Sequence, residues 1–189
     1  MSISKLQPEK GRILISEPFL GDPNFTRSVV LLVEHNSDGT IGFVLNHAIE
    51  LSLADVADDN ELPDIPLIKG GPVELNTIHF IHDLGPEIEE SFEVKKGLWW
   101  GGNFEQVLEL LEEDNTKLKH FKFFIGYSGW APGQLDGELE NDAWMVSSIS
   151  AKEALSPVLN SQELWKRTMD RLGGEFSILS KSPLDPTWN

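Results

Sequence analysis

Residues 28–46 read SVVLLVEHNSDGTIGFVLN, and this stretch decides the fold. Its aliphatic run, residues 29–33, is apolar on both faces of a strand, which is typical of a strand inside a sheet. The segment HNSDG at 35–39 carries an Asp-Gly turn signal, and residues 40–46 return as a second apolar strand. The stretch therefore predicts a β-hairpin at the centre of a sheet.

Capped periodic segments and short apolar runs predict the remaining elements. Asn103 is the expected N-cap of one amphipathic helix, and Asn160 is the expected N-cap of a second helix that runs to Leu172. Gly173 and the next glycine are expected to end that second helix. The further predicted elements are strands within 11–16, 77–82, 121–125 and 143–147, short helices within 51–59 and 134–139, and a loop over 126–133.

The order of these elements indicates the fold class. Strands cluster early in the chain, whereas helices are few and are late or inserted, a pattern that favours α+β over alternating α/β. No repeat, low-complexity stretch or linker divides the 189 residues. We therefore predict a single domain over residues 1–189.

Composition excludes several function classes. Acidic residues number 31 and basic residues 15, so the formal charge is −16, which disfavours contact with a nucleic-acid backbone. The chain has no cysteine, which excludes disulfides, thiolate metal sites and cysteine nucleophiles. The N-terminus lacks the apolar region of a secretory signal, and the longest aliphatic run is residues 29–33. We expect a cytoplasmic protein that does not contact a membrane.

Two patterns invite a catalytic or metal hypothesis. His79 and His82 are three residues apart on a predicted strand, where such residues point to opposite faces, so no metal site is expected. The stretch GYSGW around Ser128 is similar to a nucleophile elbow, but Trp130 replaces the final glycine. No histidine follows His120, so the usual order of a hydrolase triad is impossible, although another order stays open.

Paired glycines mark places where the backbone can approach a ligand closely. They lie at Gly70–Gly71, at Gly101–Gly102, and at Gly126 and Gly129. The last two sites precede predicted helix starts, where free N–H groups attract anions. The alternative is that these glycines only form turns, because no phosphate-loop or dinucleotide fingerprint accompanies them.

Three segments resemble the YqgE/AlgH family of bacterial proteins. They are GRILIS at 11–16 with DPNFxRSVVLLxEHN at 22–36 and GFVLN at 42–46; GGPV at 70–73; and GYSGWAPGQL at 126–135 with Glu138, Leu139 and Trp144. The resemblance implies an α+β fold with a bent, bifurcated, mostly antiparallel sheet that closes into a pseudo-barrel flanked by helices. It implies a cytoplasmic protein and no particular reaction, although family members are often labelled transcriptional regulators. His47 departs from the Arg-Pro that the family often has there, which weakens an anion site at that corner.

The resemblance and the loop positions together suggest a ligand site. Arg27 is expected either to form a buried ion pair with Asp22 or to anchor an anion together with Asn24. Trp130 is expected either to pack in the core, which is the favoured role, or to line a pocket. The predicted ligand-binding residues are Asp22, Asn24, Arg27, His35, Asn46, Gly70, Gly71, Gly126, Ser128, Gly129, Trp130 and Gln134.

These observations favour a non-enzymatic regulatory module that binds a small molecule or a protein partner. Direct binding of nucleic acid is not expected, and no cofactor is predicted. The alternative is an enzyme of unassigned class that acts on a small substrate, such as a phosphorylated one, near the Gly126–Gln134 loop.

Overall fold

The computed structural model describes residues 6–57, 64–158 and 160–183. The predicted hairpin is confirmed: β2 (Val29–Asn36) pairs antiparallel with β3 (Gly39–Val44). The turn is shorter than expected, because Asn36 pairs directly with Gly39 and His35 lies in the strand. All residues of the aliphatic run are buried, which is why this hairpin occupies the sheet interior.

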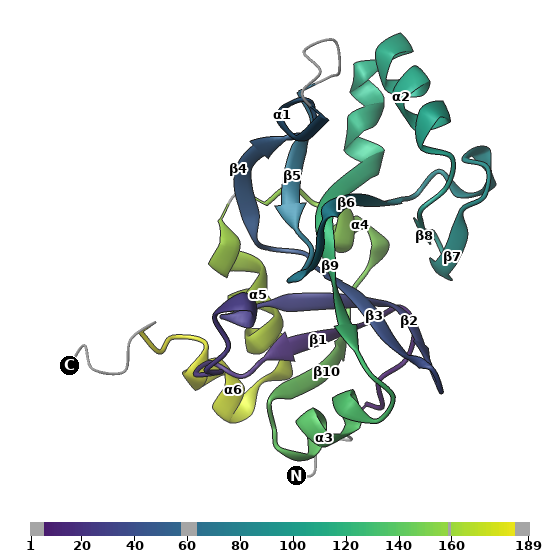
Figure 1. Ribbon diagram of the computed structural model, residues 1–189. Helices are drawn as coiled ribbons and strands as arrows, with labels where there is room; N and C mark the ends of the chain where they lie inside the picture. Colours follow the sequence, from purple (N-terminus) through teal and green to yellow (C-terminus); the bar gives the residue numbers. More distant parts are fainter. Residues whose placement is uncertain (1–5, 58–63, 159, 184–189) are drawn as a thin grey trace.

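Strand β9 (Phe121–Trp130) is the point where the sheet divides. One edge of β9 pairs with β6 (Val73–His82). The other edge pairs first with β5 (Pro66–Lys69), in parallel, and then with β3. In Figure 1, β9 accordingly runs from the group that contains β4 and β5 down to the group that contains β1, β2 and β3. The expected bent and bifurcated sheet is therefore confirmed.

The sheet does not close, so the expected pseudo-barrel is an open sheet. Its path is β10-β1-β2-β3-β9-β6-β8-β7, with β5 on β9 and β4 on β5. Every strand pair of the described residues is antiparallel except β5 with β9. The strands not yet bounded are β1 (Arg12–Ser16), β4 (Ala48–Ser52), β7 (Phe92–Lys95), β8 (Leu98–Trp100) and β10 (Trp144–Ser148).

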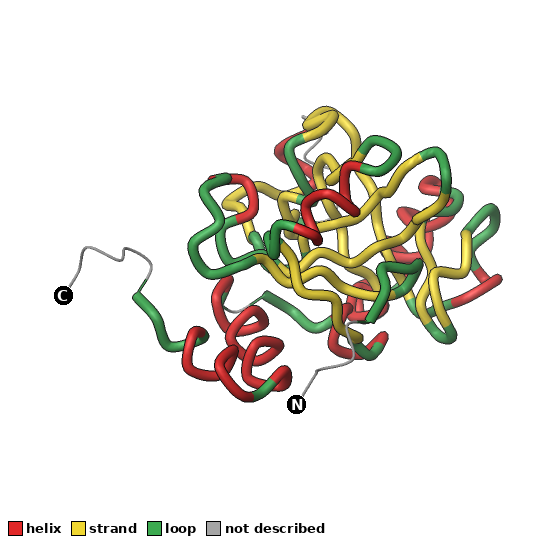
Figure 2. Tube along the Cα trace, turned by 90° about the horizontal axis from the view of Figure 1, so that it is seen from below, coloured by secondary structure: helices red, strands yellow, loops and turns green. Residues whose placement is uncertain are grey.

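Helices lie around the outside of the strands (Figure 2). Asn103 caps α2 by accepting a hydrogen bond from the Gln106 N–H at 3.1 Å, and Asn160 caps α5, which ends at Gly173 as predicted. None of the helices in the described ranges is long and apolar enough to cross a lipid bilayer. The helices are α1 (Leu53–Ala57), α2 (Phe104–Glu113), α3 (Gln134–Glu140), α4 (Ala151–Leu155), α5 (Ser161–Leu172) and α6 (Gly174–Leu179); the 3₁₀ helices are η1 (Pro23–Phe25), η2 (Gly85–Glu87) and η3 (Asn115–His120).

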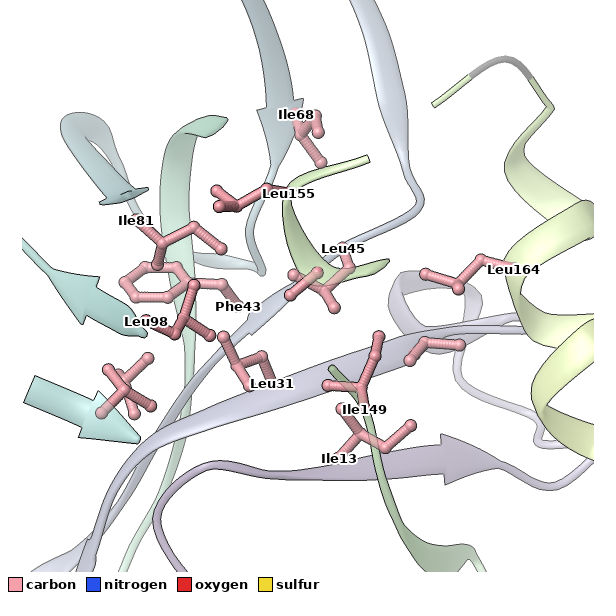
Figure 3. Close-up of a cluster of buried hydrophobic side chains, with 14 of the residues drawn as sticks. Ile13, Leu31, Phe43, Leu45, Ile68, Ile81, Leu98, Ile149, Leu155 and Leu164 are labelled. Atoms are coloured by element: carbon pink, nitrogen blue, oxygen red, sulfur yellow. The ribbon is translucent and has the colours of Figure 1, made fainter. Parts of the chain in front are cut away.

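The largest core cluster joins the hairpin to the later helices. Figure 3 shows Leu31, Phe43 and Leu45 of the hairpin beside Leu155 of α4 and Leu164 of α5. The α+β class thus follows from one apolar hairpin whose exposed face needs cover, which helices from the C-terminal half supply. A second cluster lies between β5, β6, β9 and α2.

Candidate functional site

The predicted turn at residues 22–27 is held together by local hydrogen bonds. The Asp22 carboxylate accepts hydrogen bonds from the Asn24 backbone N–H at 2.8 Å and from the Asn24 side-chain amide at 3.1 Å. The Asn24 carbonyl oxygen accepts one from Lys69 Nζ at 3.2 Å. Both residues therefore act as turn-forming groups, as Asx side chains commonly do.

Among the described residues the Arg27 guanidinium bonds to groups other than Asp22, so the predicted ion pair with Asp22 is not found, and a role in anchoring an anion stays a prediction. Its side chain is only 3% exposed and lies over the Trp165 ring, 4.9 Å from the ring centroid. Its guanidinium donates to Gln162 Oε1 at 3.2 Å and to the carbonyls of Ser182 at 2.5 Å and Pro183 at 2.8 Å. Through these hydrogen bonds, Arg27 connects α5 and the segment after α6 to the loop that precedes β2.

Asn46 and its neighbours form a second structural group. The Asn46 side chain accepts from the Val29 N–H at 2.9 Å and donates to the carbonyls of Arg27 and Ser161. His47 Nε2 lies 3.2 Å from Ser28 Oγ, and burial lowers the pKa of His47, which favours the neutral ring. These contacts join β2, β3 and the start of α5.

His35 lies apart from that group, on the hairpin. Its Nδ1 is 2.7 Å from Thr40 Oγ1 on the facing strand. This contact is a cross-strand pair of the kind that stabilises a sheet. The histidine therefore has a structural partner within the hairpin.

Gly70, Gly71 and Gly126 are packing positions at the branch of the sheet. A Cβ atom on Gly71 would collide with the Tyr127 carbonyl, and one on Gly126 would lie 2.7 Å from the Val73 carbonyl oxygen. The buried Ser128 hydroxyl donates to the Gly70 carbonyl at 2.9 Å. Close backbone approach explains why glycine stands at these positions.

The predicted loop over 126–133 is wrong for its first half, because β9 continues to Trp130. Trp130 is 5% exposed, and its indole N–H donates to Glu138 Oε2 at 2.8 Å. The same oxygen accepts from the Trp144 indole at 2.7 Å, and Gln134 donates to the other Glu138 oxygen at 2.9 Å. Phe25 of the turn packs against both tryptophan rings.

The structure therefore divides the twelve predicted residues among several structural groups. The contacts described above join these side chains to one another, to the backbone or to neighbouring core residues. Gly129 is exposed on β9 beside Trp130. Ligand binding by these residues stays a prediction, and their observed contacts are those of a packed framework.

A pocket that the sequence did not predict lies beside the branching strand. It has a volume of about 390 Å³ and forms where β4, β5 and β9 meet η3 and the segment after α4. Twelve of its fourteen lining residues are apolar and the other two are lysines. The lining residues are Ala48, Ile49, Ile65, Pro66, Leu67, Ile68, Leu118, Lys119, Phe121, Lys122, Phe123, Leu155, Pro157 and Val158. We call this cavity the Lys122 pocket.

Lys122 is the unusual side chain of this pocket. It is 6% exposed, and its only hydrogen bond among the described residues is a long one of 3.5 Å from Nζ to the Leu45 carbonyl. Burial lowers the pKa of Lys122 to about 7, because the ammonium form loses its hydration without gaining an anionic partner there. Lys119 is exposed at the rim of the same pocket. An amine in a largely apolar cavity can bind an anionic group or act as a nucleophile.

Sequence reasoning missed Lys122 although one signal was available. The residue stands in the run FKFF at 121–124, where a charged side chain interrupts an otherwise apolar strand. A strand paired on both edges buries such a residue, and lysine is rarely buried without a partner. That both edges of β9 are paired at this point depends on the β5 and β6 contacts, which the local sequence does not reveal.

Three further cavities of the described residues are less suited to a specific ligand, and the smallest of them, about 180 Å³ beside α2, is lined by three glutamates. The one on α5, about 560 Å³, mixes lysine and arginine with Glu163 and Asp170 and is widely open. The one at β6 and β8, about 400 Å³, is lined by aromatic residues and by Gly101 and Gly102. Within the described ranges, no three His, Asp or Glu side chains gather closely enough to hold a metal ion.

The histidine pair behaves as predicted on its strand. His79 packs against Phe43 on one face of the sheet, whereas His82 packs against Phe80 and Phe121 on the other. The two rings therefore do not face a common ion, as the strand geometry requires.

The fold is that of an α+β protein with an open bifurcated sheet, and this chain has an apolar, lysine-containing cavity beside the branching strand. The AlgH-like family matches residues 13–177, and the chain belongs to this family. The resemblance to the YqgE/AlgH family is therefore confirmed.

Relatives and solved structures agree with this assignment. The chain is 39% identical over 181 residues to a UPF0301 protein of Cytophaga hutchinsonii, covering 95% of this chain and 98% of the relative. It is 36% identical to a UPF0301 protein of Bacteroides thetaiotaomicron over 96% and 92% of the two chains.

Two solved structures share the fold. The AlgH protein of Pseudomonas aeruginosa is similar with a TM-score of 0.71 and 27% identity, over 94% of this chain and 98% of that one. Protein DIP2367 of Corynebacterium diphtheriae has a TM-score of 0.78 at 21% identity, over 96% of each chain. None of these four names states an activity.

Proposed function

We propose that this protein is a non-enzymatic binding module for a small molecule that has an apolar body and one anionic group. The observation that carries the proposal is the composition of the Lys122 pocket. Twelve apolar residues and two lysines line it, whereas the whole chain has an excess of 16 negative charges. An acidic protein that gathers only positive charge in an apolar cavity is suited to an amphipathic anion.

The pocket has the physical features of a ligand site. Its volume falls in the range of about 300–1,000 Å³ that is usual for small-molecule sites, which are mostly apolar with a few polar groups. A carboxylate beside Lys122 would give the amine the charged partner that it lacks among the described residues. Apolar contact would supply affinity and the ion pair would supply orientation.

Such a module would serve regulation if the ligand changed the protein's contacts with a partner. Leu155, Pro157 and Val158, which connect α4 to α5, form one wall of the pocket, so an occupant would contact the segment that leads into the C-terminal helices. We place this activity in the cytoplasm. We expect no direct contact with DNA, since the net charge opposes it.

A thermal-shift experiment tests the proposal. Octanoate and decanoate are compared with octanol and decanol on the natural protein, on Lys122→Met and on Lys119→Met. A ligand at a hundredfold its dissociation constant adds about 2.7 kcal/mol of stability, which raises Tm by roughly 5–10 °C for a protein of this size.

The proposal expects the two carboxylates to raise Tm more than the alcohols do. It expects this difference to vanish in Lys122→Met and to persist in Lys119→Met. Equal shifts in the natural protein and Lys122→Met, or no shift with any carboxylate, would overturn it. In the second case a protein partner becomes the favoured occupant.

A further inference from the structure

We infer that Lys122 is a carbonyl-reactive amine, which condenses with the aldehyde group of an apolar molecule in the Lys122 pocket to form a reversible imine. This inference rests on the proposed ligand pocket and adds a covalent step to it. It assigns a chemical role to the one buried lysine of the described residues.

The geometry places the amine in a confined apolar space. Lys122 sits on β9 opposite Ile81 of β6, and the next residue, Phe123, pairs with Leu67 of β5. The backbone of Lys122 is therefore fixed by strands on both sides. Its Nζ is 3.5 Å from the Leu45 carbonyl, a contact too long to hold the amine firmly.

The surroundings favour the neutral, nucleophilic form of this amine. No acidic residue lines the pocket within the described part of the chain, and burial lowers the pKa of Lys122 to about 7. About half of the Lys122 amines are then neutral at pH 7, against fewer than about one in a thousand for ordinary lysines. Desolvation in an apolar pocket is a recognised way of activating a lysine toward carbonyl compounds.

The reaction is balanced without any further reagent. The Nζ lone pair attacks the carbonyl carbon, and a proton moves from nitrogen to oxygen to give a carbinolamine. Loss of that oxygen as water leaves the C=N bond of the imine. Apolar walls such as Ile68 and Leu155 limit the return of water and so slow hydrolysis.

A carboxylate and an aldehyde require opposite forms of the same amine. A carboxylate pairs with the ammonium form and holds the proton on it, whereas an aldehyde consumes the neutral form. A carboxylate in the pocket should therefore protect Lys122 from an aldehyde. This competition separates the covalent step from simple binding.

The test uses octanal with sodium cyanoborohydride on the full chain between pH 6 and pH 9. Hydride adds to the imine carbon and leaves a stable secondary amine on the lysine, which intact mass and peptide mapping locate. At pH 7 we expect Lys122 to be labelled about tenfold or more faster than any other lysine, since the others are almost fully protonated. Its rate should reach half its maximum near pH 7, whereas exposed lysines still gain rate at pH 9.

The variants and the octanoate shift in Tm together distinguish failure of the imine inference from failure of the proposed function. Lys122→Met should lose the fast label without any loss of Tm, and Lys96→Met, at an exposed lysine outside the pocket, should keep the label. If Lys122 is labelled no faster than exposed lysines while octanoate still raises Tm through Lys122, the imine inference fails and the proposed function stands. If neither the label nor the octanoate shift depends on Lys122, both fail.

Discussion

Arg27 and Lys122 are both buried cations, 3% and 6% exposed, but their surroundings differ. The Arg27 guanidinium donates to three oxygens and lies over the Trp165 ring. The Lys122 amine has one long hydrogen bond and borders a cavity of about 390 Å³. A buried cation that donates to three protein oxygens serves the fold, although Arg27 Nε has no partner among the described residues. A buried cation with one long hydrogen bond beside a cavity is available to a ligand.

The difference follows from the chemistry of the two side chains. Guanidinium is weakly hydrated and presents a planar fork that matches several carbonyl groups at once. Ammonium is a compact, strongly hydrated charge, so burial without a counter-ion lowers its pKa. Replacing the two cations should therefore change the free energy of unfolding in opposite directions.

Replacing Arg27 is expected to have the largest effect. Arg27→Met removes donors from the Ser182 and Pro183 carbonyls and from Gln162, so the free energy of unfolding should fall by about 3 kcal/mol. Chemical denaturation measures this loss. Arg27→Lys serves as the control, since it keeps the charge without the fork and should recover only part of the stability. An unchanged free energy in Arg27→Met would contradict the structural role.

Replacing Lys122 is expected to act in the opposite direction. Lys122→Met removes an uncompensated buried charge and keeps an apolar chain of similar length, so the free energy of unfolding should rise by about 2 kcal/mol at pH 6. Denaturation at that pH measures the gain. A loss of stability would mean that the ammonium has a strong partner in the folded protein.

The gain from Lys122→Met should disappear as the pH rises. Since the folded pKa of Lys122 is lowered to about 7, the folded protein gives up this proton near pH 7, whereas the unfolded chain keeps it to about pH 10. Between these values the unfolded state binds more protons, so the natural protein gains stability relative to the variant. Denaturation of both proteins from pH 6 to pH 10 measures the difference between their free energies of unfolding, which should shrink and then change sign above about pH 8. A difference that stays constant over this range would refute the prediction.

The smallest effect is expected at Lys119. This residue is exposed at the pocket rim, so Lys119→Met should change the free energy of unfolding by less than about 0.5 kcal/mol. It should weaken octanoate binding only about twofold, because an exposed charge contributes little to an ion pair. Titration calorimetry measures this change. A loss as large as that of Lys122→Met would move the anion site to the rim.

Much of the fold could be predicted from local patterns. The hairpin, the Asn103 and Asn160 caps and the end of the last long helix at Gly173 all follow from short-range rules, and each is confirmed. The extension of β9 to Trp130 was missed because Gly126 and Gly129 suggest a loop. Their true role depends on the pairing of β9 with residues about 55 and 90 positions earlier in the chain.

The candidate site was harder to predict for a related reason. Polar residues in turns, such as Asp22 and Asn24, are readily predicted as ligand-binding residues. Here they form hydrogen bonds within the turn itself. The Lys122 pocket brings together residues from five separate segments, and most of them are ordinary apolar residues. Only the fold reveals that a lysine among phenylalanines borders a cavity.

Strand β9 has a consequence for how the molecule unfolds. Because β3, β5 and β6 all bond to it, neither part of the divided sheet can open fully without releasing β9. The two parts should then melt as one cooperative unit, and amide protons in the middle of β9 should exchange with solvent only through global unfolding. The Lys122 pocket lies against this strand, so a bound ligand should raise the stability of both parts of the sheet together.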